Sequence, residues 1–227
     1  MGYTRHMAED HFYTVFASVL FQLEKYSRER RATTQPFHLE EIEELFVNYN
    51  YFNHDNPVRE PLIEHVGSLP VLATILYPHI NDPEVNLGDA LIMLAIHDIG
   101  ELEVGDENVF TKNENDGDRE RAAALGLLDE QYHSYYLRVE TQSDASGKFA
   151  KSIDKIAPDF WDYITPSRHT IDRFNDFAGV NTADDILQLV RDYKSKYMSW
   201  NPFMSELHNY LLDQTYKKLK DYETTTA

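Results

Sequence analysis

Apolar side chains recur along most of the chain at intervals of three and four residues, the spacing of one face of an α-helix. Such a face is predicted between residues 11 and 30, where it consists of Phe12, Val15, Phe16, Val19, Leu20 and Leu23. Comparable faces predict helices over 39–49 and 62–76. Pro70 lies inside the latter helix and is expected to kink it, because proline lacks a backbone donor. The polar segments between these helices predict loops.

The segment from residue 87 to residue 100, LGDALIMLAIHDIG, is apolar on nearly every side and is predicted to form a buried central helix. Asn86 is a good N-cap for this helix, with Asp89 as its capping partner three residues on. Gly100 is expected to end the helix, since glycine favours the backbone conformation that follows a last turn. The acidic residues 101–117 then predict a loop.

Further helices are predicted in the second half of the chain, over about 118–127, 129–141, 145–164, 182–198 and 203–221. Thr182 with Asp185 is a typical N-cap pair, and Asn201 followed by Pro202 is a typical helix start. No segment gives convincing evidence of a β-strand. The sequence therefore predicts an all-α fold, a helical bundle with short connections that forms one domain over residues 1–227.

The composition agrees with a helical domain and narrows the choice of partners. Apolar residues make up 42% of the 227 residues, enough for a core, and nine glycines and nine prolines are too few for a turn-rich β-fold. The formal net charge of −18 repels the backbone of nucleic acids and the surface of anionic membranes. A small phosphorylated substrate stays compatible with this charge, because a metal and a few cations can reverse the field within a cleft.

The absence of cysteine restricts any metal site to His, Asp and Glu ligands. The N-terminal residues lack the apolar core of a signal peptide, and no stretch approaches the roughly 20 apolar residues that span a bilayer. The chain is therefore expected to be a soluble cytoplasmic protein without a membrane partner.

Polar residues in otherwise apolar helices carry the candidate chemistry. His97 and Asp98 close an apolar helix, where an imidazole and a carboxylate can approach one divalent cation from two directions. His65 interrupts an apolar stripe, and Asp154 lies on the inward side of its helix, where a carboxylate needs a partner. Taken singly, each of these residues can be explained as an ordinary hydrogen-bonded core residue. The acidic residues after Asp98 can likewise be explained as a solvated segment. The ordered set is therefore more informative than any of its members.

This ordered set is H…HD…D, with one histidine on an early helix, the HD pair closing a buried helix and an aspartate on a later helix. It resembles the HD superfamily of metal-dependent phosphohydrolases. The strings that carry the resemblance are EHVGSLPVLATIL, LGDALIMLAIHDIGELEVGD, GDRERAAALGLL and KFAKSIDKI. The HDIGE…GD arrangement is most similar to the 5′-deoxynucleotidase branch, in which HDxxE is followed five residues later by aspartate. The resemblance covers about residues 59–165 and implies an HD-domain helical bundle with extra helices at 8–50 and 168–221.

The resemblance also implies a role for each matching residue. The implied ligands of one divalent ion, which is Mn, Co, Fe, Zn, Ni or Mg, are His65, His97, Asp98 and Asp154. Glu101 matches the residue that positions or deprotonates the attacking water. Asp106 matches an acidic residue that holds substrate or water, and Arg59 matches a phosphate-binding residue. Weaker candidates, interpreted as surface charges, are Lys155, Arg119 and Arg121.

The expected function is hydrolysis of a phosphomonoester, a nucleoside or deoxynucleoside monophosphate, through a metal-activated water. Two alternatives stay open. One is hydrolysis of a phosphodiester or an alarmone, as in other HD branches. The other is a non-catalytic regulatory module that holds a metal for structure, with the flanking helices as a partner surface or a homodimer interface.

Overall fold

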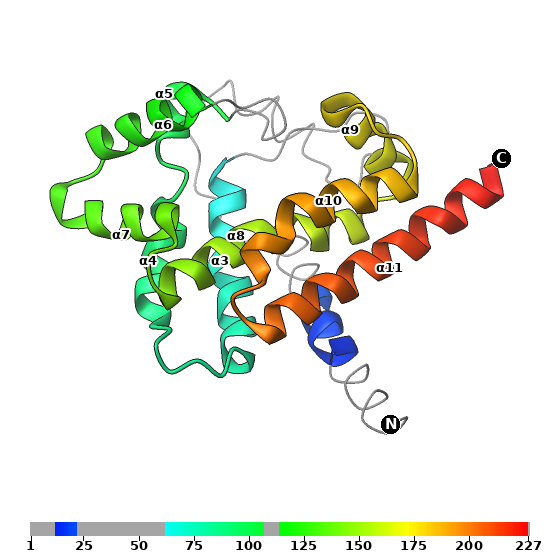
Figure 1. The fold of residues 1–227 in the computed structure, drawn as a ribbon, viewed down its shortest axis with the longest axis horizontal. Coiled ribbons are helices and arrows are strands. Elements are labelled where there is room, and N and C mark those ends of the chain that lie inside the picture. The colour runs from blue at the N-terminus through cyan, green and yellow to red at the C-terminus, as the bar shows by residue number, and fades with distance from the viewer. Residues whose placement is uncertain (1–11, 22–61, 107–113, 227) are drawn as a thin grey trace, which may run out of the picture.

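The computed structural model describes residues 12–21, 62–106 and 114–226 of the chain. Within these ranges every regular element is a helix (Figure 1), so the predicted all-α fold is confirmed. After a helix at 12–21, the elements are α3 (Leu62–Leu76), η1 (Tyr77–His79), α4 (Leu87–Ile96), α5 (Glu101–Val104), α6 (Glu114–Leu127), α7 (Glu130–Thr141), α8 (Ala145–Ile164), α9 (Ser167–Ala178), α10 (Ala183–Met198) and α11 (Pro202–Thr226). The predicted helix at 39–49 and the candidate phosphate ligand Arg59 lie outside the described residues.

The predicted boundaries hold for α7, α8 and α10, and differ from the structure elsewhere. The predicted loop at 101–117 is wrong at both ends, because α5 begins at Glu101 and α6 already begins at Glu114. Acidic residues in a first turn are favoured by the positive end of the helix dipole, so an acidic run can start a helix. The second miss is α9, whose apolar face includes Ile171 and Phe174 and was not predicted as a separate helix.

The helix around which the others pack is α8, not α4. It contacts α3, α4, α7, α10 and α11, and Figure 1 shows it passing through the middle of the bundle. Twelve of its 20 residues are buried, against three of the ten in α4, so the prediction of a central helix at 87–100 is wrong. Hydropathy alone indicated the wrong central helix, because the buried residues of α8 include polar and acidic ones. Examples are Ser152 and Asp154, which have partners inside the protein.

The larger of two hydrophobic clusters among the described residues joins α8 to the N-terminal helix and to α11. Phe149 and Phe160 of α8 are fully buried, and such burial stabilises the fold by about 1.5–3 kcal/mol per side chain. The ring of Phe16, from helix 12–21, lies with its centroid 6.3 Å from that of Phe160 and 4.8 Å from that of Tyr163. None of the described helices is long and apolar enough to cross a membrane.

The start of α4 is capped as predicted, but the capping partner has another role. The side chain of Asn86 accepts a hydrogen bond from the backbone N–H of Asp89, at 3.1 Å. The carboxylate of Asp89 instead pairs with Arg138 at 2.8 Å, and Arg138 also binds Asp144, the N-cap of α8, at 2.5 Å. The backbone N–H of Asn86 donates to Ser146 at 2.8 Å. These bonds tie α4, α7 and α8 together at one end of the bundle.

Gly100 does not end α4 in the way that the sequence suggested. The helix ends at Ile96, and Gly100 has φ −63°, an ordinary right-handed conformation that any residue adopts. A β-carbon at this position would lie 2.4 Å from the backbone oxygen of Glu120. Glycine is therefore required here by the close approach of α6, which brings Glu120 beside the segment that follows α4.

A buried ionic cluster fastens the two C-terminal helices to α8. Asp159 of α8 accepts hydrogen bonds from Lys194 of α10 and from Nδ1 of His208 of α11, the latter at 2.9 Å. All three side chains are buried. Burial raises the pKa of Asp159, but the charge of Lys194 and the bond from His208 outweigh it and hold the pKa below its usual value. The carboxylate is therefore ionised in the folded protein and neutralises a buried cation.

Replacing Asp159 with alanine should destabilise the fold by about 3–5 kcal/mol, because it leaves the buried Lys194 ammonium without its counter-charge. Urea unfolding at neutral pH measures this difference. Asp176→Ala on α9 is the matched control, since Asp176 is exposed and its loss should change stability by no more than about 0.5 kcal/mol. Equal stability of the two variants would contradict the role assigned to Asp159.

The pH dependence of this contribution follows from the lowered pKa of Asp159. A carboxyl group whose pKa is lower in the folded state stabilises the fold above its unfolded pKa of about 3.9, and stops doing so as pH falls through the folded value. The difference in unfolding free energy between the wild type and Asp159→Ala should therefore be full at neutral pH and shrink in acid. A difference that grows on acidification would contradict this account.

Candidate metal centre

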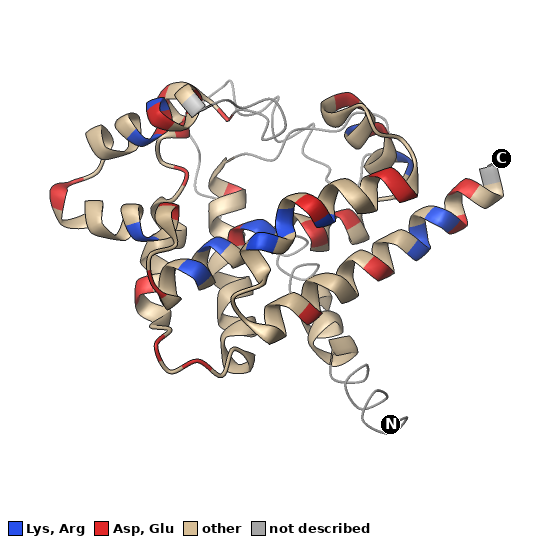
Figure 2. Cartoon of the chain, viewed as in Figure 1, with Lys and Arg blue, Asp and Glu red and all other residues tan. Residues whose placement is uncertain are grey.

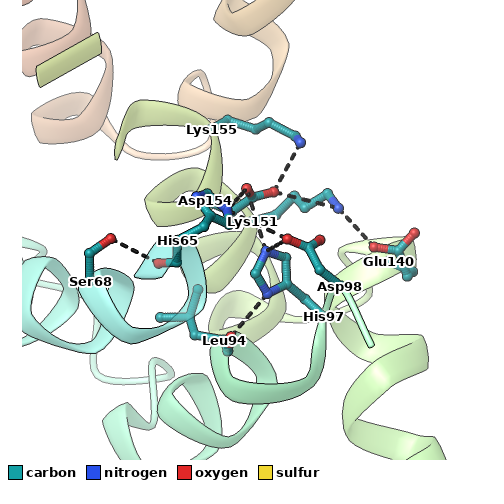
Figure 3. A network of polar contacts seen from close by, with 9 residues as sticks. All are labelled: His65, Ser68, Leu94, His97, Asp98, Glu140, Lys151, Asp154 and Lys155. Atoms are coloured by element: carbon teal, nitrogen blue, oxygen red, sulfur yellow. Dashed lines mark hydrogen bonds and ion pairs between the residues drawn. The ribbon is translucent and has the colours of Figure 1, made fainter. Parts of the chain in front are cut away.

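The four residues of the predicted metal site come together from three parts of the fold (Figure 3). His65 comes from α3, His97 and Asp98 from the turn after α4, and Asp154 from α8. Nε2 of His97 lies 3.0 Å from Oδ2 of Asp98 and 3.5 Å from Oδ1 of Asp154. Nε2 of His65 lies 3.5 Å from each of the same two carboxylate oxygens. Two imidazole nitrogens and two carboxylate oxygens thus face one small space.

The orientation of His97 is set by its other ring nitrogen. Nδ1 lies 2.9 Å from the backbone oxygen of Leu94, one turn earlier, and donates its hydrogen there. In the neutral ring Nε2 then carries only a lone pair, and this buried atom has no hydrogen-bond partner. A lone pair that faces the oxygens of Asp98 and Asp154 is repelled unless a positive charge lies between them. The geometry therefore requires a proton or a metal ion at this point.

The two carboxylates set the charge of the site. Burial raises the pKa of Asp154, but the charges of Lys155 and His97 outweigh it and hold the pKa well below the usual value. Burial acts on Asp98 in the same way, and its contact with the imidazole of His97 lowers the pKa of Asp98 below the usual value. Burial lowers the pKa of His97, but Asp154 and Asp98 together raise it to about 9. Without a metal, a proton on His97 supplies the positive charge that the ionised carboxylates demand.

The donor set fits a divalent cation. Ligand atoms of His65, His97 and Asp154 lie within 4.8 Å of one another. Asp98 lies within ion-pair distance of both imidazoles and offers a fourth ligand. Imidazole nitrogen with carboxylate oxygen is a ligand set for Mn, Fe, Co, Ni or Zn, and His97 already has the backbone hydrogen bond that fixes a metal-binding tautomer. Its buried Nε2, which lacks a partner, is the observation that most directly supports metal binding.

A second acidic group adjoins these ligands. Carboxylate oxygens of Asp98, Glu101 and Glu120 lie within 4.8 Å of one another. Burial, followed by the charges of Asp98, Asp106 and Glu120, raises the pKa of Glu101 to about 8. Glu120 was not predicted from the sequence, because it lies on α6, outside the histidine–aspartate motif, and only the fold brings it close.

The remaining predicted residues have different outcomes. Asp106 is exposed. Its negative charge contributes to the raised pKa of Glu101. Arg59 lies outside the described residues. Arg119 and Arg121 are exposed and make long ion pairs, at 3.8 and 3.7 Å, within their own helix, in agreement with their interpretation as surface charges.

Lys155 is not the surface charge that the sequence suggested. Its Nζ lies 3.0 Å from Oδ2 of Asp154, and its side chain is only 20% exposed. Lys151, one turn earlier, also approaches Asp154, at 3.7 Å, but pairs more closely with Glu140, at 2.7 Å. Figure 3 shows the two lysines beside Asp154. Adjacent residues on a helix point about 100° apart, so helical spacing did not indicate that Lys155 reaches the carboxylate of its neighbour.

Comparisons with known proteins point to one family. A family model described as an HD domain matches residues 51–186, which include all four candidate ligands and Glu101. Among solved structures, the chain is similar to a protein described as a predicted metal-dependent phosphohydrolase from Magnetospirillum magnetotacticum MS-1. The two are 25% identical, with 70% of this chain and 82% of that chain covered, at a TM-score of 0.49. No curated protein matches the chain.

Binding of a divalent ion should stabilise the folded protein. At a free concentration of Mn²⁺ one hundred times its Kd, the free energy of unfolding should rise by about 2.7 kcal/mol, because the ion binds the folded state alone. Metal-stripped protein should therefore melt at a higher temperature after addition of Mn²⁺, and Asp154→Asn should lose this increase. Differential scanning calorimetry, with each variant compared with its own metal-free form, measures the effect.

The control is Asp172→Asn, the same change at an exposed carboxylate of α9, which should keep the full response to metal. An equal rise in melting temperature for Asp154→Asn and for the wild type would show that the ion binds elsewhere.

Proposed function

Because the chain belongs to the HD-domain family, we propose that it is a metal-dependent phosphohydrolase and that its substrate is a nucleoside or deoxynucleoside monophosphate. The observation that carries the proposal is the buried Nε2 of His97, which faces two ionised carboxylates without a hydrogen-bond partner. Glu101, whose oxygens lie within 4.8 Å of those of Asp98, supplies a carboxylate beside the ligands. A metal held only for structure does not need such a group.

The ligands would hold the ion through the two imidazoles and the two carboxylates. When bound there, a divalent ion polarises a phosphoryl oxygen and lowers the pKa of a bound water. The hydrogen bond between His97 and Leu94 keeps the imidazole in the tautomer and orientation that this requires. The burial of His97 and Asp154 excludes bulk water from one side of the centre and leaves the side of His65, Asp98 and Glu101 for substrate.

Glu101 is the residue placed to handle the proton. It begins α5, immediately after the turn that carries His97 and Asp98, and it is half-buried. Its ionised form orients a water molecule and accepts the proton that the attacking oxygen loses. Burial and the acidic neighbours raise the pKa of Glu101 to about 8. A positive charge nearby lowers this pKa and favours the ionised form that the role needs.

The choice of a monophosphate rests on charge and on motif. The net charge of −18 disfavours polymeric phosphates, whereas Lys155 and Lys151 provide local positive charge close to the ligands. The spacing from Glu101 to Asp106 is the spacing that resembles the 5′-deoxynucleotidase branch. Hydrolysis of diesters or alarmones, and a non-catalytic module, are the outcomes that a substrate panel separates from this proposal.

Metal-loaded protein should release phosphate from nucleoside monophosphates, and Glu101→Gln should slow this release by roughly a hundredfold to ten-thousandfold, because the group that accepts the proton is lost. The substitution keeps the size of the side chain, so the variant should still bind metal in calorimetric titrations. Glu103→Gln is the matched control, since Glu103 is an exposed residue of the same short helix.

The same assay should include a cyclic nucleotide and an alarmone as substrates. Cleavage of these, with no release from any monophosphate, would replace the proposed substrate class by another. Metal binding without hydrolysis of any member of the panel would leave a regulatory module as the better description. Full activity of Glu101→Gln would contradict the role of that residue.

A further inference from the structure

A groove on the surface of the protein lies apart from the candidate metal centre. It has a volume of about 410 Å³ and forms where the helix at 12–21, η1 and the first turns of α11 meet. His65 lies near the start of α3, whereas η1 directly follows Leu76, the last residue of that helix. From His65 to Leu76 an α-helix rises by about 17 Å, so the groove and the metal centre lie at opposite ends of α3.

Three nearly parallel rings line this groove. The centroid of the Phe203 ring lies 5.2 Å from that of His79, at an interplanar angle of 20°, and 5.7 Å from that of Phe12, at 26°. At these separations the rings are offset, so part of each face is not covered by the next ring. The face of an aromatic ring has a negative electrostatic potential, which attracts a cation.

Glu206 adds a negative charge to the groove. It follows Phe203 by about one turn of α11, and its side chain is exposed. Among the described residues it has no ion-pair partner. Figure 2 shows lysines and arginines along α8 and α10, and none on the helix at 12–21, on η1 or on the first turns of α11. The described side chains of the groove therefore offer a carboxylate to a cation and no lysine or arginine to an anion.

The remaining lining is apolar or neutral. Pro78 at the start of η1 and Pro202 at the start of α11 present their rings to the groove, and Asn81 lines it as well. A metal ion needs several oxygen or nitrogen ligands, which one carboxylate among such side chains does not supply. An alkylated ammonium group has its charge spread beneath carbon groups, so ring faces, proline rings and one carboxylate together match it.

We propose that this groove binds a small alkylated ammonium ion. The positive charge lies against the faces of Phe203 and His79 and next to Glu206, and the alkyl groups pack on Pro78 and Pro202. The volume of about 410 Å³ falls within the roughly 300–1,000 Å³ of small-molecule sites. This site is separate from the phosphohydrolase function proposed above and does not depend on it.

Choline is the probe for this site, and 3,3-dimethyl-1-butanol, which has nearly the same shape without the charge, is its control. Both are titrated into the wild-type protein by calorimetry, with Mn²⁺ present so that the acidic metal centre does not compete for the cation. Choline should bind at one site and roughly fivefold or more tightly than the alcohol, because the ring faces and the carboxylate attract only the charged compound.

Glu206→Gln should weaken the binding of choline roughly twofold to fivefold and leave the binding of the alcohol unchanged. Glu206 is exposed, so this variant should fold as the wild type does. Phe203→Leu should also weaken the binding of choline, because it keeps an apolar side chain but removes the ring face. Glu130→Gln, at an exposed glutamate in the first turn of α7, is the matched control and should bind choline as the wild type does.

Three results would each overturn the proposal. They are no binding of choline to the wild type, equal affinities of the wild type for choline and for the alcohol, and an affinity for choline that Glu206→Gln leaves unchanged.

Discussion

The structure depends on how the buried charge of Asp154 is neutralised. A carboxylate taken out of water costs several kcal/mol unless positive charge and hydrogen bonds surround it. One oxygen of Asp154 faces two imidazoles at 3.5 Å, and the other faces the ammonium of Lys155 at 3.0 Å. The two imidazoles can neutralise the oxygen that they face only if a proton or a metal ion lies between the imidazole nitrogens and the carboxylate. The chemistry of the site follows from this one requirement.

Helix α8 carries buried carboxylates that face different neighbours. Asp154 faces α3 and the turn after α4, whereas Asp159, five residues later, faces Lys194 and His208 on the two C-terminal helices. The same helix therefore carries a carboxylate of the candidate metal centre and a carboxylate that anchors the region beyond the HD-domain match. Loss of the second ion cluster would loosen the attachment of α10 and α11 to α8.

The sequence predicted what depends on local spacing and missed what depends on contacts between distant helices. The helical periodicity and the N-caps are local, and the order of His65, His97 and Asp98 along the chain was enough to suggest one cluster. Glu120 could not be found this way, because only the close packing of α6 against Gly100 brings it there. The long side chain of Lys155 bends back toward its neighbour, and this is equally invisible in a helical pattern.

The central claim is that two imidazoles and two carboxylates hold one divalent ion. X-ray absorption at the cobalt edge of protein loaded with one equivalent of Co²⁺ tests it most directly. The account predicts a first shell of two imidazole nitrogens with carboxylate and water oxygens, and the loss of one imidazole in His97→Ala. A first shell made only of oxygen, or a spectrum that His97→Ala leaves unchanged, would contradict it.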